Sequence, residues 1–114
     1  MTRMSARGSS VAAMPTEIRD NIALERFEIH VDGTLVGYTD YQDTAAERAF
    51  VHTEIHGAGT GYGHELIESA LNATGVEGLG VLPMCPLVQQ FVEQRPEYLT
   101  MVPHWARDQL GLSQ

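Results

Sequence analysis

The residues best suited to binding chemistry form a glycine-rich stretch in the middle of the chain. Glycine occupies positions 57, 59, 61 and 63, between a β-branched run that ends at Ile55 and an amphipathic pattern that follows at once. Glycine loses more conformational freedom on folding than any other residue, so four glycines so close together indicate that the backbone here has a specific role. A strand, a glycine loop and a helix in this order present unpaired N–H groups at the positive end of a helix dipole. The pattern therefore indicates a phosphate-bearing ligand; the alternative is a connection that binds nothing.

Two histidines, His52 and His56, lie just before this loop. Strict alternation along a strand predicts one shared face for Phe50, His52, Glu54 and His56. The spacing of the histidines is similar to that of zinc ligands, but the helical zinc-protease motif has Glu directly after the first His, where Thr53 stands here, so we expect no metal site. A histidine beside a reacting centre can accept a proton, directly or through water. A half-buried strand histidine without a chemical role fits the pattern equally well.

The single cysteine, Cys85, directly precedes Pro86. Proline is favoured at the first position of a helix, so the pair predicts Cys85 at a helix N-cap. There the helix dipole favours the thiolate and lowers the pKa of the thiol. Three roles remain open: a nucleophile that takes up a group covalently, a proton donor or polar neighbour, and a buried small hydrophobe. We expect His52 and Cys85 to face each other across one cleft.

The composition excludes several classes of function. The formal net charge is −8, lysine does not occur, and the arginines are scattered. Without a basic stripe, nucleic acid is not an expected partner, and an acidic surface favours cationic or amine-bearing ligands. No apolar run reaches the roughly 20 residues of a membrane helix, so no membrane partner is expected. One cysteine forms no internal disulfide, which suits a reducing, cytoplasmic location.

The periodicity predicts one α/β domain. Residues 1–15 are expected to be a disordered tail, and residues 16–114 a single domain. Alternating strands are expected over 26–31, 34–41 and 48–55, with a hairpin at Asp32-Gly33, then a helix over 64–74 ended by Gly75, and a parallel strand over 78–82. A helix from Pro86, a strand over 98–102 and a short helix within 104–114 complete the chain. The fold class is thus a mixed sheet, with an antiparallel meander followed by a β-α-β unit and a C-terminal helix.

Four blocks occur in order at close spacing: Phe50–Ile55, Gly59–Gly63, Leu82–Val88 and Arg95–Tyr98. Together they resemble a compact, single-domain branch of the GCN5-related N-acetyltransferase (GNAT) family, over roughly residues 26–102. A glycine loop alone would be weak support, but four ordered blocks are much more specific.

The resemblance implies a GNAT-like fold and acetyl-CoA as the acetyl donor. The implied activity is transfer of the acetyl group to a primary amine of a protein or small molecule. The implied cofactor-binding residues are Ile55, Gly59, Thr60, Gly61, Tyr62, Gly63 and His64, and the implied catalytic residues, near the acetyl group, are His52 and Cys85. Ala58 stands where the family usually has Gln or Arg. Tyr98 is expected to pack beside the cleft or to act as an acid toward the leaving thiolate. The alternative function is an acyl-CoA-binding or regulatory protein with little transferase activity.

Overall fold

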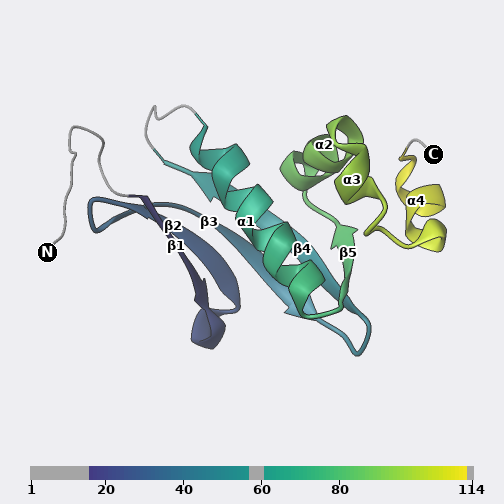
Figure 1. The fold of residues 1–114 in the computed structure, drawn as a ribbon, viewed down its shortest axis with the longest axis horizontal. Helices are drawn as coiled ribbons and strands as arrows, with labels where there is room; N and C mark the ends of the chain where they lie inside the picture. Colours follow the sequence, from purple (N-terminus) through teal and green to yellow (C-terminus); the bar gives the residue numbers. More distant parts are fainter. Residues whose placement is uncertain (1–15, 57–60, 113–114) are drawn as a thin grey trace, which may run out of the picture.

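The computed structural model describes residues 16–56 and 61–112. The elements in this part of the chain are β1 (Thr16–Asn21), a 3-10 turn η2 (Ile22–Leu24), β2 (Arg26–Val31), β3 (Thr34–Asp43), β4 (Glu47–Ile55), α1 (Tyr62–Val76), β5 (Gly80–Pro83), α2 (Pro86–Gln94), α3 (Pro96–Leu99) and α4 (His104–Leu110) (Figure 1). The predicted tail, residues 1–15, lies outside the described residues, and so do Gly57, Ala58, Gly59 and Thr60 of the predicted loop.

The strands form one mixed sheet in the order β1-β2-β3-β4-β5. Neighbours from β1 to β4 are antiparallel, whereas β5 is parallel to β4 because α1 carries the chain back across the sheet. The hairpin between β2 and β3 turns at Asp32 and Gly33, both at positive φ, as the dipeptide predicts. The predicted fold class is confirmed: an antiparallel meander, a β-α-β unit and helices at the C-terminal end.

The meander has one more strand than the periodicity predicts. β1 pairs with β2 from Thr16↔Val31 to Asn21↔Arg26 at the edge of the sheet. Most of its residues are exposed, and charged side chains occupy the positions where an apolar alternation would mark a strand. Charged residues are typical of edge strands, where they discourage pairing with another chain. The same residues hide the strand from an analysis based on hydrophobic periodicity.

Helix α1 covers the core with an apolar stripe. Its buried residues include Leu66, Ile67, Ala70 and Leu71, which recur at the spacing of one helical face, as the amphipathic pattern predicts. The prediction that Gly75 ends the helix is wrong: α1 continues to Val76, and the left-handed residue after it is Gly78, at φ +78°. A Cβ on Gly75 would lie only 3.1 Å from Met101 Cε, so this glycine allows close packing rather than a helix stop.

The predicted strand over residues 98–102 is also wrong. Pro96 begins the short helix α3 instead, and Tyr98 and Leu99 donate their backbone N–H groups to Arg95 O. A hydrogen bond from Val81 N to Met101 O, 2.9 Å long, links this segment to β5. The short helix predicted near the C-terminus is confirmed as α4.

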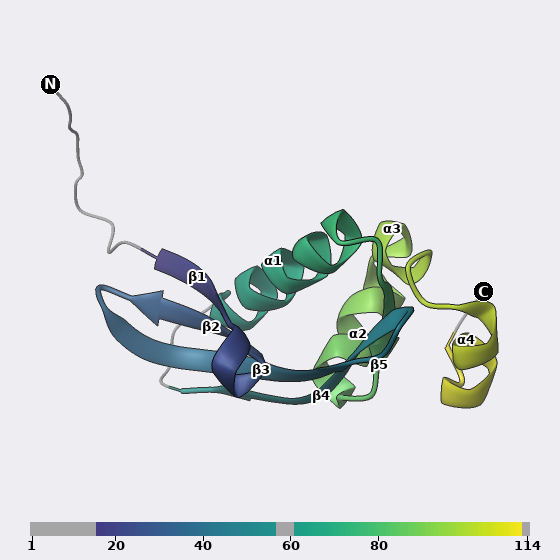
Figure 2. The same ribbon diagram turned by 90° about the horizontal axis from the view of Figure 1, so that it is seen from below.

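Helices cover only one face of the sheet. Figure 2 shows α1 lying across β2, β3 and β4, with α2 and α3 beside it on the same side. The buried side chains of these helices meet those of the sheet in one core, which includes Ile29, Phe50 and Val81. Burial of each such side chain contributes about 1.5–3 kcal/mol. No described helix covers the opposite face of β2–β4, and on that face the β4 side chains of His52 and Glu54 are exposed to solvent.

Candidate active site

The geometry of the site begins with an irregularity in β4. Asp40 pairs with His52 and Tyr41 with Phe50, so Val51 is an extra residue with no partner of its own in β3. A β-bulge of this kind reverses which face the following side chains occupy. Phe50 is fully buried against the helices, but His52 points to the uncovered face. The prediction of one face for Phe50 and His52 is therefore wrong, although His52, Glu54 and His56 do share a face.

Beyond the bulge, β4 and β5 separate. Their pairing runs only from Glu47↔Gly80 to Phe50↔Pro83, whereas β4 continues to Ile55. The N–H groups of Met84 and Cys85 both donate to Phe50 O at 3.0 Å, and α2 then leads the chain away from β4. The free edge of β4 thus borders a notch rather than a neighbouring strand.

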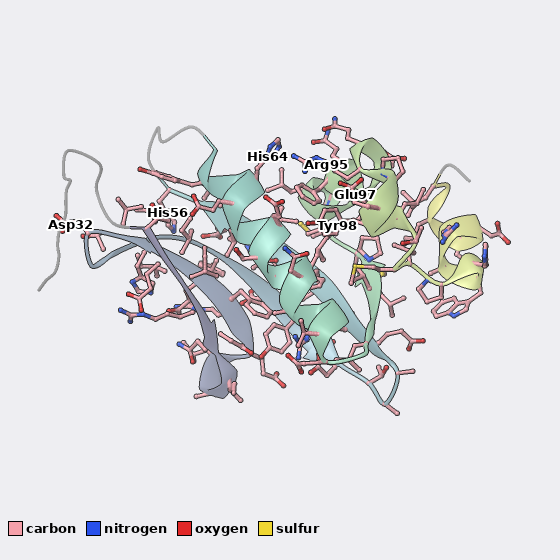
Figure 3. All side chains as sticks on the ribbon, in the orientation of Figure 1. Asp32, His56, His64, Arg95, Glu97 and Tyr98 are labelled. Atoms are coloured by element: carbon pink, nitrogen blue, oxygen red, sulfur yellow. The ribbon has the colours of Figure 1, made fainter. Side chains whose placement is uncertain are left out.

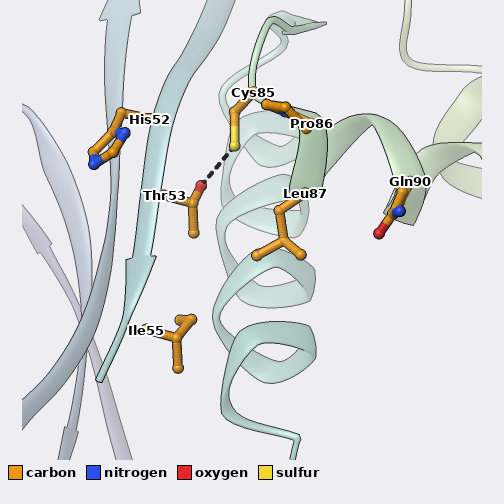
Figure 4. A pocket seen from close by; sticks show the side chains of 7 residues that line it. All are labelled: His52, Thr53, Ile55, Cys85, Pro86, Leu87 and Gln90. Carbon is orange, nitrogen blue, oxygen red and sulfur yellow. Dashed lines mark hydrogen bonds between the residues drawn. The ribbon is translucent and has the colours of Figure 1, made fainter. Parts of the chain in front are cut away.

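This notch holds a cavity of about 540 Å³. Its walls come from the end of β4 and the start of α2: His52, Thr53, Ile55, Cys85, Pro86, Leu87 and Gln90 (Figure 4). One end of the cavity is polar, at Cys85 and Thr53, and the other is apolar, at Ile55 and Leu87. A long ligand with a reactive polar end suits such a lining.

Cys85 occupies the N-cap of α2, as predicted, but its thiol does not cap the helix. The side chain is buried, and its Sγ donates to Thr53 Oγ1 at 3.2 Å (Figure 4). His52 points to the opposite face of the sheet from Thr53. The expectation that the side chains of His52 and Cys85 face each other is therefore wrong: both line the cavity, but the partner of the thiol is Thr53.

On the uncovered face, His52 belongs to a small polar cluster. Its Nε2 lies 3.0 Å from Glu54 Oε2, and His56 Nε2 lies 3.8 Å from the other oxygen of the same carboxylate. The Tyr38 ring is near both imidazoles, with centroid distances of 6.2 and 6.5 Å. The hydrogen bond from His52, followed by one from Tyr38, lowers the pKa of Glu54. Glu54 is therefore a carboxylate at neutral pH, which accepts hydrogen bonds and donates none.

A protein-family model described as GCN5-related N-acetyl-transferase matches residues 26–101. The chain belongs to this family. The matched range contains β2 to β5, α1, α2 and every residue that lines the notch, so the GNAT assignment covers the whole candidate site. A comparison with curated protein sequences gave no match.

GNAT proteins generally use acetyl-CoA, and the start of α1 tests whether this chain can hold such a donor. Gly61 is the N-cap at φ +85°, its side is open, and no side chain caps the helix. A Cβ placed on Gly63 would lie 3.6 Å from Ile55 Cγ1 and 3.8 Å from Leu87 Cδ2. The uncapped N-terminus of α1 therefore adjoins the apolar end of the cavity. The residues that are described fit a ligand with both a phosphate group and an extended arm.

His64 lies on the first turn of α1, beside α2. Its ring meets Phe91 edge-on with centroids 5.8 Å apart, and the Arg95 guanidinium lies 5.0 Å from the centre of the same ring. Figure 3 shows His64 and Arg95 close together at this end of the helix pair. An arginine at the edge of the predicted phosphate site adds a positive charge to the field of the helix N-terminus.

Tyr98 packs inside the protein. It is 8% exposed, its ring lies 5.3 Å from that of Phe91, and its hydroxyl donates to Asn72 Oδ1 at 3.1 Å. Tyr98 is not among the residues that line the notch, so the structure favours its packing role over the acid role.

In the described ranges, no group of three or more His, Cys, Asp or Glu side chains could hold a metal ion. Nor is any described helix long and apolar enough to span a bilayer.

Three residues that line the notch were not predicted from the sequence: Thr53, Leu87 and Gln90. Thr53 was passed over because strict alternation places it away from His52 and the site, and only the bulge at Val51 brings it to the thiol. Leu87 looked like an ordinary member of the apolar face of α2. The one usable signal was its position directly after Cys85-Pro86, because the first turn of a helix next to a reactive residue often lines the same cleft.

Proposed function

We propose that this protein transfers the acetyl group of acetyl-CoA to a primary amine. The observation that carries the proposal is the notch between the free edge of β4 and the start of α2, which joins an uncapped helix N-terminus to a buried thiol. Family membership supports an acetyltransferase-type function in general. The choice of donor, acceptor and catalytic residues is the part proposed here.

The pyrophosphate of the donor would lie on the backbone N–H groups at the start of α1, which have no acceptor within the helix. Tyr62, Gly63 and His64 supply these groups, and the proposal extends to Gly59 and Thr60 before them. Gly61 leaves the approach open because it carries no side chain. A backbone cradle needs no arginine, so Ala58 in the usual Gln or Arg position weakens binding without preventing it.

The pantetheine arm would follow the free edge of β4 toward Cys85. Ile55 and Leu87 give this path apolar walls, while Thr53 and Cys85 give it a polar end. The thioester would then lie beside the Cys85 sulfur. The amine would reach it from the uncovered face of the sheet, where no described helix blocks the approach.

His52 would accept the proton of the attacking amine, directly or through one water. The Glu54 carboxylate can only accept a hydrogen bond, so the Nε2 of His52 carries a hydrogen and Nδ1 of the neutral ring keeps its lone pair. The nitrogen–carbon bond forms, the carbon–sulfur bond of the thioester breaks, and the electron pair leaves on the CoA sulfur. The Cys85 thiol would donate its proton to that sulfur, and Cys85 would recover a proton from solvent in the next cycle.

Steady-state release of free CoA tests the proposal. The purified protein with acetyl-CoA and a panel of primary amines, including lysine peptides, polyamines and small monoamines, should release CoA at a rate proportional to enzyme concentration. Undetectable release with every amine, together with tight CoA binding, would favour the acyl-CoA-binding or regulatory alternative.

Incubation with acetyl-CoA alone separates direct transfer from an acetyl-cysteine intermediate. Direct transfer predicts no acetyl adduct in the intact-protein mass. An adduct that is lost in Cys85→Ala and on addition of an amine would replace direct transfer by covalent transfer through Cys85.

A further inference from the structure

Two threonine hydroxyls extend from the Cys85 thiol into the sheet, Thr53 first and Thr39 beyond it. Thr53 Oγ1 is 3.2 Å from Cys85 Sγ and 2.8 Å from Thr39 Oγ1. Thr39 is fully buried, whereas Thr53 lines the cavity. A chain of polar groups therefore runs from the core of the sheet to the wall of the notch, and Figure 4 shows its last link, from Thr53 to the sulfur.

The three groups differ in how many of their hydrogens have an acceptor when the sulfur is protonated and when it is not. Three polar groups share two links, and within residues 16–56 and 61–112 neither threonine hydroxyl has another hydrogen-bond partner. With the thiol protonated, three hydrogens share the two links. If Thr53 accepts from both Thr39 and Cys85, its own hydrogen has no acceptor within the group and faces the notch. After the thiol loses its proton, Thr39 donates to Thr53 and Thr53 donates to the sulfur. Each hydrogen then has an acceptor.

The backbone of β3 and β4 holds these three polar groups in place. Thr39 and Thr53 are directly paired residues of β3 and β4, and the Cys85 N–H donates to Phe50 O of the same β4 at 3.0 Å. The thiol makes no capping bond to α2, so in the described structure it is Thr53 that hydrogen-bonds the sulfur. Strand pairing fixes the position of Thr53 Oγ1, so only its hydroxyl hydrogen has to turn toward the sulfur when the thiol proton leaves.

We propose that Thr53, supported by Thr39, is a positioning residue that directs the Cys85 thiol into the notch and hydrogen-bonds the sulfur when its proton leaves. This inference rests on the proposed function, in which Cys85 protonates the departing CoA sulfur. Thr53 lowers the cost of that step because its hydroxyl hydrogen gains the sulfur as an acceptor when the thiol proton is lost. Hydrogen bonds to charged groups are stronger than neutral ones, so the effect is largest in the deprotonated state.

The test is the pH dependence of Cys85 alkylation by iodoacetamide, followed by intact-protein mass on the full chain without acetyl-CoA. Thr53→Val keeps the shape of the side chain and removes the hydroxyl. It should slow alkylation at neutral pH by about tenfold and move the midpoint of the pH profile upward. Thr53→Ser should restore the wild-type profile, and Thr39→Val should give a smaller change in the direction of Thr53→Val. An unchanged rate and midpoint in Thr53→Val, or a serine variant that behaves like valine, would overturn the proposal.

Folding and turnover are followed separately. Thermal unfolding of each variant shows whether it folds. If Thr53→Val does not fold, Thr39→Val removes the hydroxyl behind Thr53 instead, and an unchanged alkylation rate and midpoint in that variant would overturn the proposal. The alkylation assay needs neither acetyl-CoA nor an amine. A protein that alkylates as expected but releases no CoA contradicts the proposed function alone, whereas normal turnover with an unchanged alkylation profile in Thr53→Val contradicts the role of Thr53 alone.

Discussion

Gly37 of β3 lies directly against Ile55, the last residue of β4. A Cβ on Gly37 would be 2.7 Å from Ile55 Cδ1 and 2.9 Å from the carbonyl oxygen of Glu54. Real Cβ atoms do not approach so closely, so this position holds glycine because the backbone and the cavity wall leave no space for a side chain. The relationship connects the stability of the sheet to the shape of the notch.

Gly37→Ala should therefore destabilise the protein by about 1–3 kcal/mol, since overpacking forces the end of β4 to move. Denaturant unfolding followed by circular dichroism measures this change. Gly80→Ala is the matched control, because a Cβ there would be 3.4 Å from its nearest neighbours, within ordinary contact. Equal stability of the two variants would show that the end of β4 yields easily and that Gly37 does not define the notch.

Gly61→Asp should abolish binding of acetyl-CoA. The aspartate would bring bulk and negative charge to the N-terminus of α1, where the pyrophosphate is proposed to lie. Isothermal titration calorimetry measures the affinity, and Gly78→Asp is the control, since Gly78 has a similar φ of +78° and an equally open side but lies beyond the other end of α1. Undiminished affinity in folded Gly61→Asp would contradict the proposed binding site.

His52→Gln should lower kcat by about 10²–10⁴-fold with little change in the KM for acetyl-CoA, because a proton acceptor acts in the chemical step. His56→Gln is the control: His56 contacts the same Glu54 and lies near the same Tyr38 ring, but it does not line the notch. Steady-state CoA release measures both variants. Equal loss in the two would point to the stability of the polar cluster rather than to a proton acceptor.

Glu28 should make the protein sensitive to acid. Burial alone would raise the pKa of this carboxyl, but hydrogen bonds from His30, Arg26 and Asn21 outweigh it and hold the pKa at about 2, below the ordinary 4.5. Because the folded-state pKa is depressed, the stabilisation is complete above pH 4.5 and is lost as the pH falls toward 2.

The loss amounts to at most about 3.5 kcal/mol, since the pKa falls from 4.5 to about 2 and one pKa unit corresponds to about 1.4 kcal/mol. Unfolding free energies measured between neutral pH and pH 2 should show it. Glu28→Gln should be less stable at neutral pH and should have a flatter profile below pH 4.5. An identical acid profile in that variant would show that other carboxyl groups control the transition.

The sequence was informative where a local pattern decides the structure. The stripe of α1, the hairpin at Asp32-Gly33 and the Cys85-Pro86 helix start depend on short-range periodicity, turn chemistry and proline geometry, and each was predicted. Gly75 was misread because a glycine at the end of an apolar stripe looks the same whether it stops the helix or makes room for Met101.

The arrangement of the site could be predicted only in part. Cys85, His52 and Ile55 were expected near one cleft, and all three line the notch. The partner of the thiol was not predicted, because a single extra residue, Val51, reverses the faces of β4. Alternation counts residues and carries no information about a bulge, so the contact between Thr53 and Cys85 depends on strand pairing that the sequence does not reveal.

The most direct test of the central claim is a titration of the ¹⁵N-labelled protein with acetyl-CoA, followed by backbone amide shifts in NMR spectra. We expect the largest shifts at Tyr62, Gly63 and His64, at the start of α1, and at Thr53 and Cys85, across the notch. Two results would contradict the proposed binding site: shifts confined to other surfaces, such as the small cavity between β5 and α4, or no shifts at about 1 mM acetyl-CoA, the upper end of typical KM values.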